Sequence, residues 1–502
     1  MNTFDIRLLV VLVLISLFAE RDSYAGHIVQ GIVSDVDGGK PLDRIEVRGM
    51  IVDSEGQLQL ATPRLFDTTG LDGKFRIELP DGFKEPISIA FYDPGPRPEG
   101  LYTYWEYTAL SSDSDTTINP VLYRIGRAPA SLLSAAVRRL ASSTVALEGD
   151  SKFSLEATLI ELVARQRKDG PDRIRFGKEL NEMLAYARPA RRKLNIGTER
   201  EGWMINEGNL QMFRWPDTAK DRVAECSIVQ NLGYSGDWLL TSRSGIAVVR
   251  DHSHPWGHDS EFFTLMGREG HRSYLDLMLS SAASSAASGH NAIGSADGEI
   301  FVIDSDDLKK IAGLELGASP ITAVSLREYR RKVRVAGATI DGRMRVWEAT
   351  SEDDGRLSEF KLIRDVRLSR SFPNSLALSS NLSLIFVGSG FATKDCGISV
   401  VSVSTGFEVS SATKSPVLNV ADFDREDVVS IEESGTMIAW KLTSDHELRQ
   451  NIVLTDLGIE SAIPASARKG VFITRGDKKQ PLFVPLSAVE EEQLKLDIMK
   501  FK

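Results

Sequence analysis

The sequence predicts a mainly β, multidomain protein whose C-terminal part is a β-propeller. A phrase of strand, turn and strand recurs along the last three-fifths of the 502-residue chain, with turns at Gly208, Gly245, Gly298, Gly342, Gly397, Gly435 and Lys479. The turns lie about 45 residues apart on average, which is the period of a propeller with one four-stranded blade per repeat. Ahead of the repeats, alternating apolar residues predict a β-sandwich, and a helical spacing predicts a short connector.

The first 25 residues have the pattern of an export signal. Arg7 precedes an apolar run from Leu8 to Phe18, and Ser23-Tyr24-Ala25 offers a small-x-small cleavage site. Because the run is too short to span a bilayer comfortably, we expect a signal peptide over 1–25. This predicts a secreted or cell-envelope protein that meets the membrane only through its signal; an uncleaved anchor is the alternative.

Composition narrows the class of partner. Hydrophobic residues make up 42% of the chain and charged residues 26%, as in ordinary globular proteins. The net charge of −10 argues against nucleic acid as a partner, because binding to a phosphate backbone needs clustered Lys and Arg. Cys226 and Cys396 fall in repeats about half a turn of the ring apart, too far for a disulfide, so we expect both to be buried and unpaired.

Residues 27–125 are predicted to form the sandwich. Apolar residues alternate with charged ones over 74–79, and similar alternation occurs at 45–48 and 87–91. Alternation predicts strands with one packed face and one face in water. Leu71-Asp72-Gly73-Lys74 is a hairpin signal, since glycine tolerates the positive φ that such turns need.

Three stretches of this unit resemble the carboxypeptidase regulatory-like domain, a small transthyretin-like β-sandwich. They are Gln30 to Asp35, Gly39 to Val47, and Thr68 to Phe75, although Gly70 stands where the family often has Asp and 51–66 is a long insert. The resemblance implies an accessory module of secreted and surface proteins, without catalytic residues of its own.

Residues 126–193 change to a helical spacing. Apolar stripes within 132–140, 155–163 and 176–187 predict three helices, and Pro129 suits a first helical turn. We expect these three helices to form a connector between the sandwich and the propeller. The tail, 488–502, is predicted to be a charged helix.

The propeller is expected over 195–487. Blades stack on both faces, so their inner strands should be apolar throughout, as Ile300 to Ile303 and Ile398 to Val401 nearly are. Trp347 and Trp440 stand near strand ends where the WD-repeat family places its Trp, so the region resembles a divergent WD-repeat propeller. That family's Gly-His pair and Asp–His–Ser/Thr–Trp hydrogen-bond set are mostly missing from the sequence. We expect seven blades, with six as the alternative.

One cluster carries potential metal chemistry. The chain has no Walker loop, Gly-x-Ser-x-Gly, His-Glu-x-x-His or Cys-x-x-Cys motif, so no cofactor is expected from these signatures. His252 and His254 would share one side of a strand, and His258 or Asp259 could fold back toward them. Imidazole and carboxylate ligands suit Zn²⁺ or another transition metal. The competing interpretation is a polar loop that leaves a blade.

Aromatic residues gather in the sandwich. Tyr102, Tyr104, Trp105 and Tyr107 could stack on sugar rings and form a carbohydrate-binding edge. The alternative is that they are half-buried packing residues of a strand and its loops.

These features predict an exported, non-enzymatic protein that recognises a protein partner through the loops of its propeller, with cell-surface polysaccharide as the second choice of partner. Two rival functions remain. One is an enzyme at the propeller channel, such as a metal-assisted hydrolase that uses the His252 cluster. The other is a glycan-binding sandwich for which the propeller is only a scaffold.

Overall fold

The chain divides into two compact units, Met1–Leu162 and Val163–Lys502, in the computed structural model. The structure describes residues 27–52, 58–60, 65–79, 87–94, 101–110, 115–129, 132–133, 135–136, 151–169, 193–196, 201–206, 209–214, 225–231, 238–241, 246–254, 257–264, 272–275, 279–284, 289–295, 297–304, 309–317, 319–352, 356–424, 427–455, 458–465, 470–475 and 482–486. The predicted signal, the third connector helix and the tail therefore lie outside the described residues.

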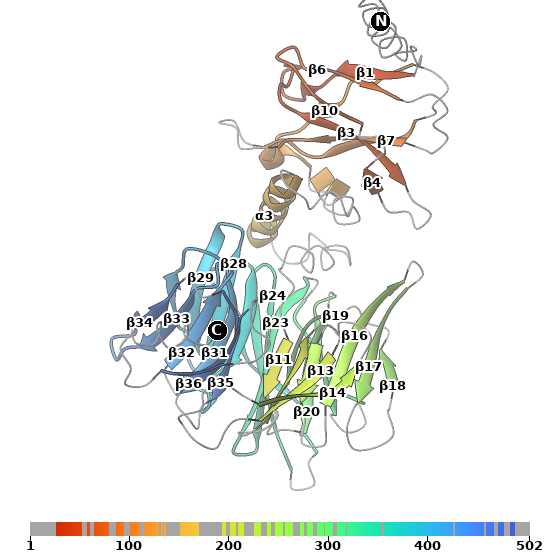
Figure 1. The fold of residues 1–502 in the computed structure, drawn as a ribbon. Helices are drawn as coiled ribbons and strands as arrows, with labels where there is room; N and C mark the ends of the chain where they lie inside the picture. The colour runs from red at the N-terminus through yellow and green to blue at the C-terminus, as the bar shows by residue number, and fades with distance from the viewer. Residues whose placement is uncertain are drawn as a thin grey trace, which may run out of the picture. The chain divides into compact units, whose positions relative to one another are not determined.

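The first unit is built of short strands in three sheets (Figure 1). The largest has the order β4-β3-β7-β8, with β5 also paired to β3; the others have the orders β6-β1-β9 and β10-β2. The strands are β1 Ile28–Ile32, β2 Ser34–Asp35, β3 Glu46–Val52, β4 Leu58–Leu60, β5 Phe66–Thr68, β6 Lys74–Glu78, β7 Ile87–Tyr92, β8 Trp105–Leu110, β9 Thr116–Thr117 and β10 Val121–Leu122.

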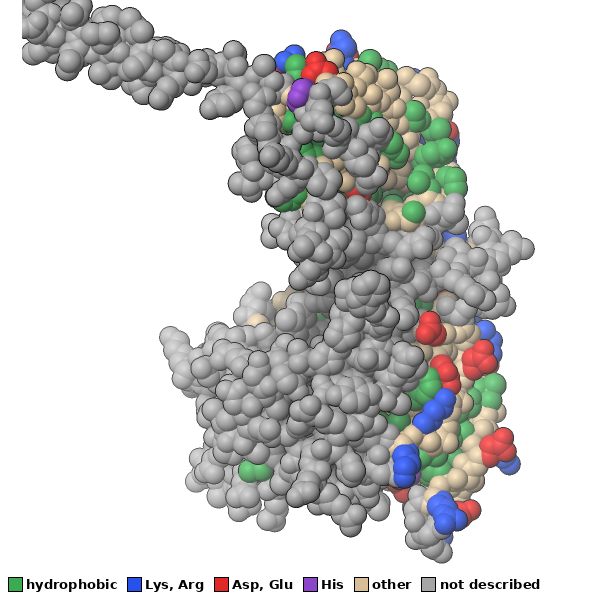
Figure 2. Space-filling model, turned by 90° about the vertical axis from the view of Figure 1, so that its right-hand side faces the viewer, with side chains coloured by type: hydrophobic (Ala, Val, Ile, Leu, Met, Phe, Trp, Pro, Cys, Tyr) green, Lys and Arg blue, Asp and Glu red, His purple; other side chains and the backbone are tan. Residues whose placement is uncertain are grey.

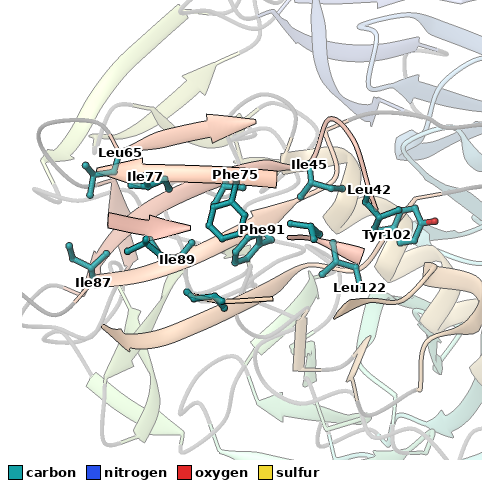
Figure 3. Packing of buried hydrophobic residues seen from close by; sticks show 14 of the residues in the cluster. Leu42, Ile45, Leu65, Phe75, Ile77, Ile87, Ile89, Phe91, Tyr102 and Leu122 are labelled. Atoms are coloured by element: carbon teal, nitrogen blue, oxygen red, sulfur yellow. The ribbon is translucent and has the colours of Figure 1, made fainter. Parts of the chain in front are cut away.

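One apolar cluster joins these sheets (Figure 3). Phe75 of β6 meets Phe91 of β7 edge to face, with ring centroids 5.2 Å apart. Val29 of β1 and Val47 of β3 belong to the same cluster, so both larger sheets bury one face in it. Burial of this apolar area is the main force that holds the unit together.

The prediction of one face in water is right for β6 and wrong for β7. In β6 the side chains alternate between exposed and buried, whereas all six residues of β7 are buried. Arg48 on β3 is buried as well and pairs with Glu46. A strand buried on both faces must be covered by a second layer of the structure.

Two of the predicted connector helices have described residues. The second is α3, Ser151–Asp169, and residues 132–133 and 135–136 are helical; the short 3₁₀ helix η1 spans Ile125–Arg127. In the part of the chain that the structure describes, no helix is long and apolar enough to cross a membrane.

The described strands of the second unit form seven sheets in chain order. Six have four strands and the last has three, and each sheet is a simple antiparallel meander. The first four sheets are β11 Lys193–Ile196, β12 Glu201–Asn206, β13 Asn209–Arg214, β14 Glu225–Asn231; β15 Trp238–Thr241, β16 Ile246–His254, β17 Gly257–Thr264, β18 Arg272–Leu275; β19 Leu279–Ser284, β20 His290–Ser295, β21 Glu299–Asp304, β22 Lys310–Glu315; and β23 Ile321–Tyr329, β24 Lys332–Thr339, β25 Arg343–Thr350, β26 Lys361–Arg367. The last three are β27 Pro373–Leu378, β28 Leu384–Phe391, β29 Lys394–Ser402, β30 Glu408–Ala412; β31 Val417–Asp424, β32 Asp427–Glu432, β33 Met437–Leu442, β34 Leu448–Leu454; and β35 Ile459–Ala465, β36 Gly470–Arg475, β37 Leu482–Pro485.

The sheets stand side by side around a ring (Figure 1). The first strand of each sheet contacts the first strand of the next, from β11 through β15, β19, β23, β27 and β31 to β35, and β35 contacts β11 again. Apolar clusters fill the spaces between neighbouring sheets, as between the fourth and fifth. This arrangement is a β-propeller.

The predicted turns are partly correct. Gly298, Gly342 and Gly435 have φ of 85°, 84° and 79° and follow the second strand of their sheets, as expected. Gly397 instead lies inside β29, and Ala392 takes the left-handed conformation at that turn with φ of 51°. Gly245 comes after the first strand of its sheet, so the turn of that repeat lies between β16 and β17.

One tryptophan hydrogen bond joins two strands of the sixth sheet. The fully buried Trp440 on β33 donates from Nε1 to Oγ of Ser430 on β32 over 2.7 Å. The two stretches expected to be inner strands, residues 300–303 and 398–401, are buried throughout, but they lie in β21 and β29, the third strands of their sheets, whereas the first strands line the ring.

We predict that Ser430→Ala lowers the free energy of unfolding by about 1–3 kcal/mol, because it leaves a buried indole N–H without its acceptor. Chemical denaturation followed by the propeller's tryptophan fluorescence measures this cost. In a Trp440→Phe background the same substitution should cost much less, and an equal cost in both backgrounds would contradict the pairing.

Candidate functional site

Strand order gives the propeller two loop faces. Because the strands of each sheet are antiparallel, the turn between the second and third strands lies at the same end as the link to the next sheet. We call this end the upper face; it carries the turns at Gly298, Gly342 and Gly435. The lower face carries the turns between first and second strands and between third and fourth strands.

On the upper face, the turn of the fourth sheet contains Asp341, which is fully buried. Its Oδ1 accepts a hydrogen bond from Thr339 Oγ1 at 2.5 Å, and its Oδ2 accepts one from Arg367 Nη1 at 2.8 Å. Gly342 follows with φ of 84°, and a Cβ there would lie 2.5 Å from the carbonyl oxygen of Arg370. A side chain at this position would collide with that backbone oxygen, so only glycine fits the turn.

Two arginines share one carboxylate beside this turn. Asp365 Oδ2 lies 3.0 Å from Arg343 Nη2 and 2.9 Å from Arg345 Nε, and Arg345 also donates to the carbonyl oxygen of Glu315 in the third sheet at 2.7 Å. Burial raises the pKa of Asp365, but the hydrogen bonds from both guanidinium groups outweigh it, so the pKa is lowered. The carboxylate is thus ionised and held in place at neutral pH.

The last turns of α3 reach the same face through Arg167. Its Nη1 donates to Ser371 Oγ at 2.7 Å and its Nη2 to the carbonyl oxygen of Leu368 at 2.8 Å. Burial and the neighbouring charge of Arg367 lower the pKa of Arg167. The contact joins two residues that are 204 positions apart in the sequence.

The link continues into the fifth sheet. Arg370 donates from Nη1 to the carbonyl oxygen of Cys396 at 3.0 Å, and Asp395 Oδ2 accepts from the backbone N–H of Ser371 at 3.0 Å. Glu408 accepts from both the backbone and the hydroxyl of Ser369. Each of these charged groups holds a loop in place, so the upper face is a rigid, preorganised surface.

Cys396 lies near the start of β29, at the upper-face end of the fifth sheet. Burial raises the pKa of the Cys396 thiol to about 11, so the thiolate that a nucleophile requires is scarce at neutral pH. Cys396 is unpaired and buried, as predicted, and the side chain of Cys226 lies outside the description. Across the described residues, no group of three or more His, Cys, Asp or Glu side chains is placed to hold a metal ion.

The predicted metal ligands lie on the β16–β17 hairpin, whose turn is on the upper face. His252 is opposite Asp259, His254 is opposite Gly257, and His258 is opposite Ser253. Directly opposed residues occupy the same face of a sheet, so the register puts His252, His254 and Asp259 at positions of one face and His258 at a position of the other. Their side chains lie outside the description, and the metal site stays a prediction.

The predicted sugar-binding aromatics have packing roles where they are described. Tyr102 is buried and donates its hydroxyl to Asp35 Oδ2 at 2.8 Å, and Tyr104 is buried and bonds Glu106 at 2.7 Å. Trp105 is half-buried against the apolar cluster, and the side chain of Tyr107 lies outside the description. The burial favours the packing interpretation, because a stacking platform needs exposed ring faces.

The known proteins that resemble this chain are solved structures with low sequence identity. No family model and no curated protein matches the sequence. Among solved structures, the chain is similar to the WD40 β-propeller domain of Doa1 (15% identity, TM-score 0.41, 61% of this chain and 95% of that one). It is also similar to U3-55K (12%, 0.42, 59% and 96%) and to a chain of the mitotic checkpoint complex (13%, 0.41, 59% and 90%).

We predict that the stability of the protein falls on acidification partly through Asp365. Its folded pKa lies below the unfolded value of 3.8, so its contribution is fully present above that pH and is lost as the pH falls through the folded pKa. Asp365→Asn should therefore flatten the fall in melting temperature between about pH 4 and pH 2. The control is Asp445→Asn, which removes an exposed carboxyl; equal flattening by both variants would contradict the prediction.

Proposed function

We propose that this protein is an exported, non-enzymatic binding protein whose propeller loops recognise a protein partner. The observation that carries the proposal is the upper face, where arginine side chains of the fourth sheet and of its link to the fifth donate hydrogen bonds to neighbouring segments. Such a surface loses little conformational entropy when a partner binds, which favours specific recognition. Figure 2 shows acidic and basic side chains interspersed on the described part of the propeller surface, a mixture suited to another protein.

We also propose how the chain is divided into domains. We propose that the seven described sheets are the seven blades of a closed ring, supported by the contact of β35 with β11. Residues 27–125 would act as a carboxypeptidase regulatory-like accessory module; the single apolar cluster shared by their two larger sheets supports this. Residues 1–25 would direct export.

A metal-assisted enzyme is the second candidate, and one observation favours it. The β16–β17 register gives His252, His254 and Asp259 positions on one face of the sheet, as a transition-metal site would need. Metal analysis of untagged protein tests it: the enzyme proposal requires near-stoichiometric metal and a rise in melting temperature on adding zinc.

We predict that affinity capture from the native source with the full chain yields a discrete protein partner, and that reversing charge on the upper face abolishes it. The variant is Lys394→Glu with Lys414→Glu, two exposed residues at the turn and link of the fifth sheet. The control is Arg449→Glu on the outer strand β34, where the side chain is 65% exposed. Equal capture by all three proteins would contradict an upper-face interface, and capture of nothing specific would contradict the function.

A further inference from the structure

The lower face of the fourth sheet carries an unusual hairpin. Strands β23 and β24 pair down to Tyr329 opposite Lys332, so Arg330 and Arg331 are the two residues of the turn. Both are left-handed, with φ of 48° and 66°. A two-residue turn of this kind strongly favours Asn-Gly or Gly-Gly, because side chains with a Cβ are disfavoured at positive φ. Two arginines there cost stability that the sheet itself does not require.

The turn displays a compact basic and aromatic tip, Tyr329 to Lys332, in which all four residues are exposed. The Arg330 guanidinium lies 5.1 Å from the centre of the Tyr329 ring, within the range of a cation–π contact. Aromatic and arginine side chains are the residue types that dominate binding energy at protein interfaces. The tip therefore has the composition of an interface anchor.

The base of this tip is firmly held. Arg327, two residues before the tip, donates to the carbonyl oxygen of Leu378 at 2.7 Å and pairs with the buried Asp422 of the sixth sheet. The carbonyl oxygen of Arg331 accepts from the backbone N–H of Ser351 at 2.7 Å. Lys332 pairs with Glu348 at 3.0 Å, so the tip is anchored by both backbone and side-chain contacts although its four residues are exposed.

We infer that this tip is a docking point for an acidic segment of a partner protein. Arg330 and Arg331 bring positive charge to one point of a chain whose net charge is −10, so they favour a negative partner. One short hairpin offers too few cations for a membrane surface, where clusters of about 4–8 Lys or Arg are usual, or for a nucleic-acid track. This inference rests on the proposed function and assigns the lower face a partner chemistry.

The decisive variant is Arg330→Asn with Arg331→Gly in the full chain, because it removes both charges and installs the turn sequence that the backbone prefers. We expect its melting temperature to rise while its affinity for a labelled 12-residue Asp/Glu peptide falls about tenfold, the combined worth of two exposed charge pairs. Arg330→Lys with Arg331→Lys keeps the charge and should keep much of the affinity. Wild-type binding should weaken from 50 to 300 mM salt.

Three results would overturn the inference. The peptide does not bind the wild-type protein, or it binds the Asn-Gly variant equally well, or the tip binds single-stranded nucleic acid or phosphatidylserine vesicles in preference to the peptide. If the Asn-Gly variant still captures the native partner while the Lys394→Glu, Lys414→Glu variant does not, the lower-face inference fails and the proposed function stands.

Discussion

The propeller depends on hydrogen bonds that run from the first strand of one sheet to the first strand of the next. Thr322 on β23 donates to the carbonyl oxygen of Pro373 on β27 at 2.5 Å, and Ser375 on β27 accepts from the backbone N–H of Val420 on β31 at 3.2 Å. These strands would otherwise present backbone groups without partners toward their neighbours, which is costly in a buried place. The bonds help to fix the spacing of the fourth, fifth and sixth sheets, and with it the positions of the loops that these sheets carry on both faces.

Much of this fold could be predicted from the sequence, because period and turn chemistry are local signals. Gly298, Gly342 and Gly435 mark their turns since a left-handed residue is needed there. The prediction failed at Gly397, which lies inside β29, and Gly245 falls between the first and second strands of its sheet, one turn earlier than expected. Ala392 shows why: tertiary contacts can hold an ordinary residue at positive φ, and no local pattern reveals that.

The contacts of the upper face could not be predicted from the sequence, because they join residues on different strands or far apart along the chain. Arg167 contacts Ser371 across 204 residues of sequence. Arg343 and Arg345 on β25 pair with Asp365 on the neighbouring strand β26. The only signal was the density of arginines around the fourth repeat, and that does not tell paired from free groups. Conversely, a hydrogen bond such as that from Tyr102 to the buried Asp35 leaves no trace in a sequence, so the sequence could not tell packed aromatic residues from exposed ones.

Closure of the ring is the central claim about this fold. Deletion of the seventh sheet, residues 459–486, tests it most directly. In a closed ring, β11 loses the contact that β35 provides, so the first sheet should lose hydrogen-exchange protection although it lies more than 200 residues away in sequence. In an open stack, repeats contact only their sequence neighbours. Unchanged protection of β11 to β14, with loss confined to the sixth sheet, would contradict the propeller.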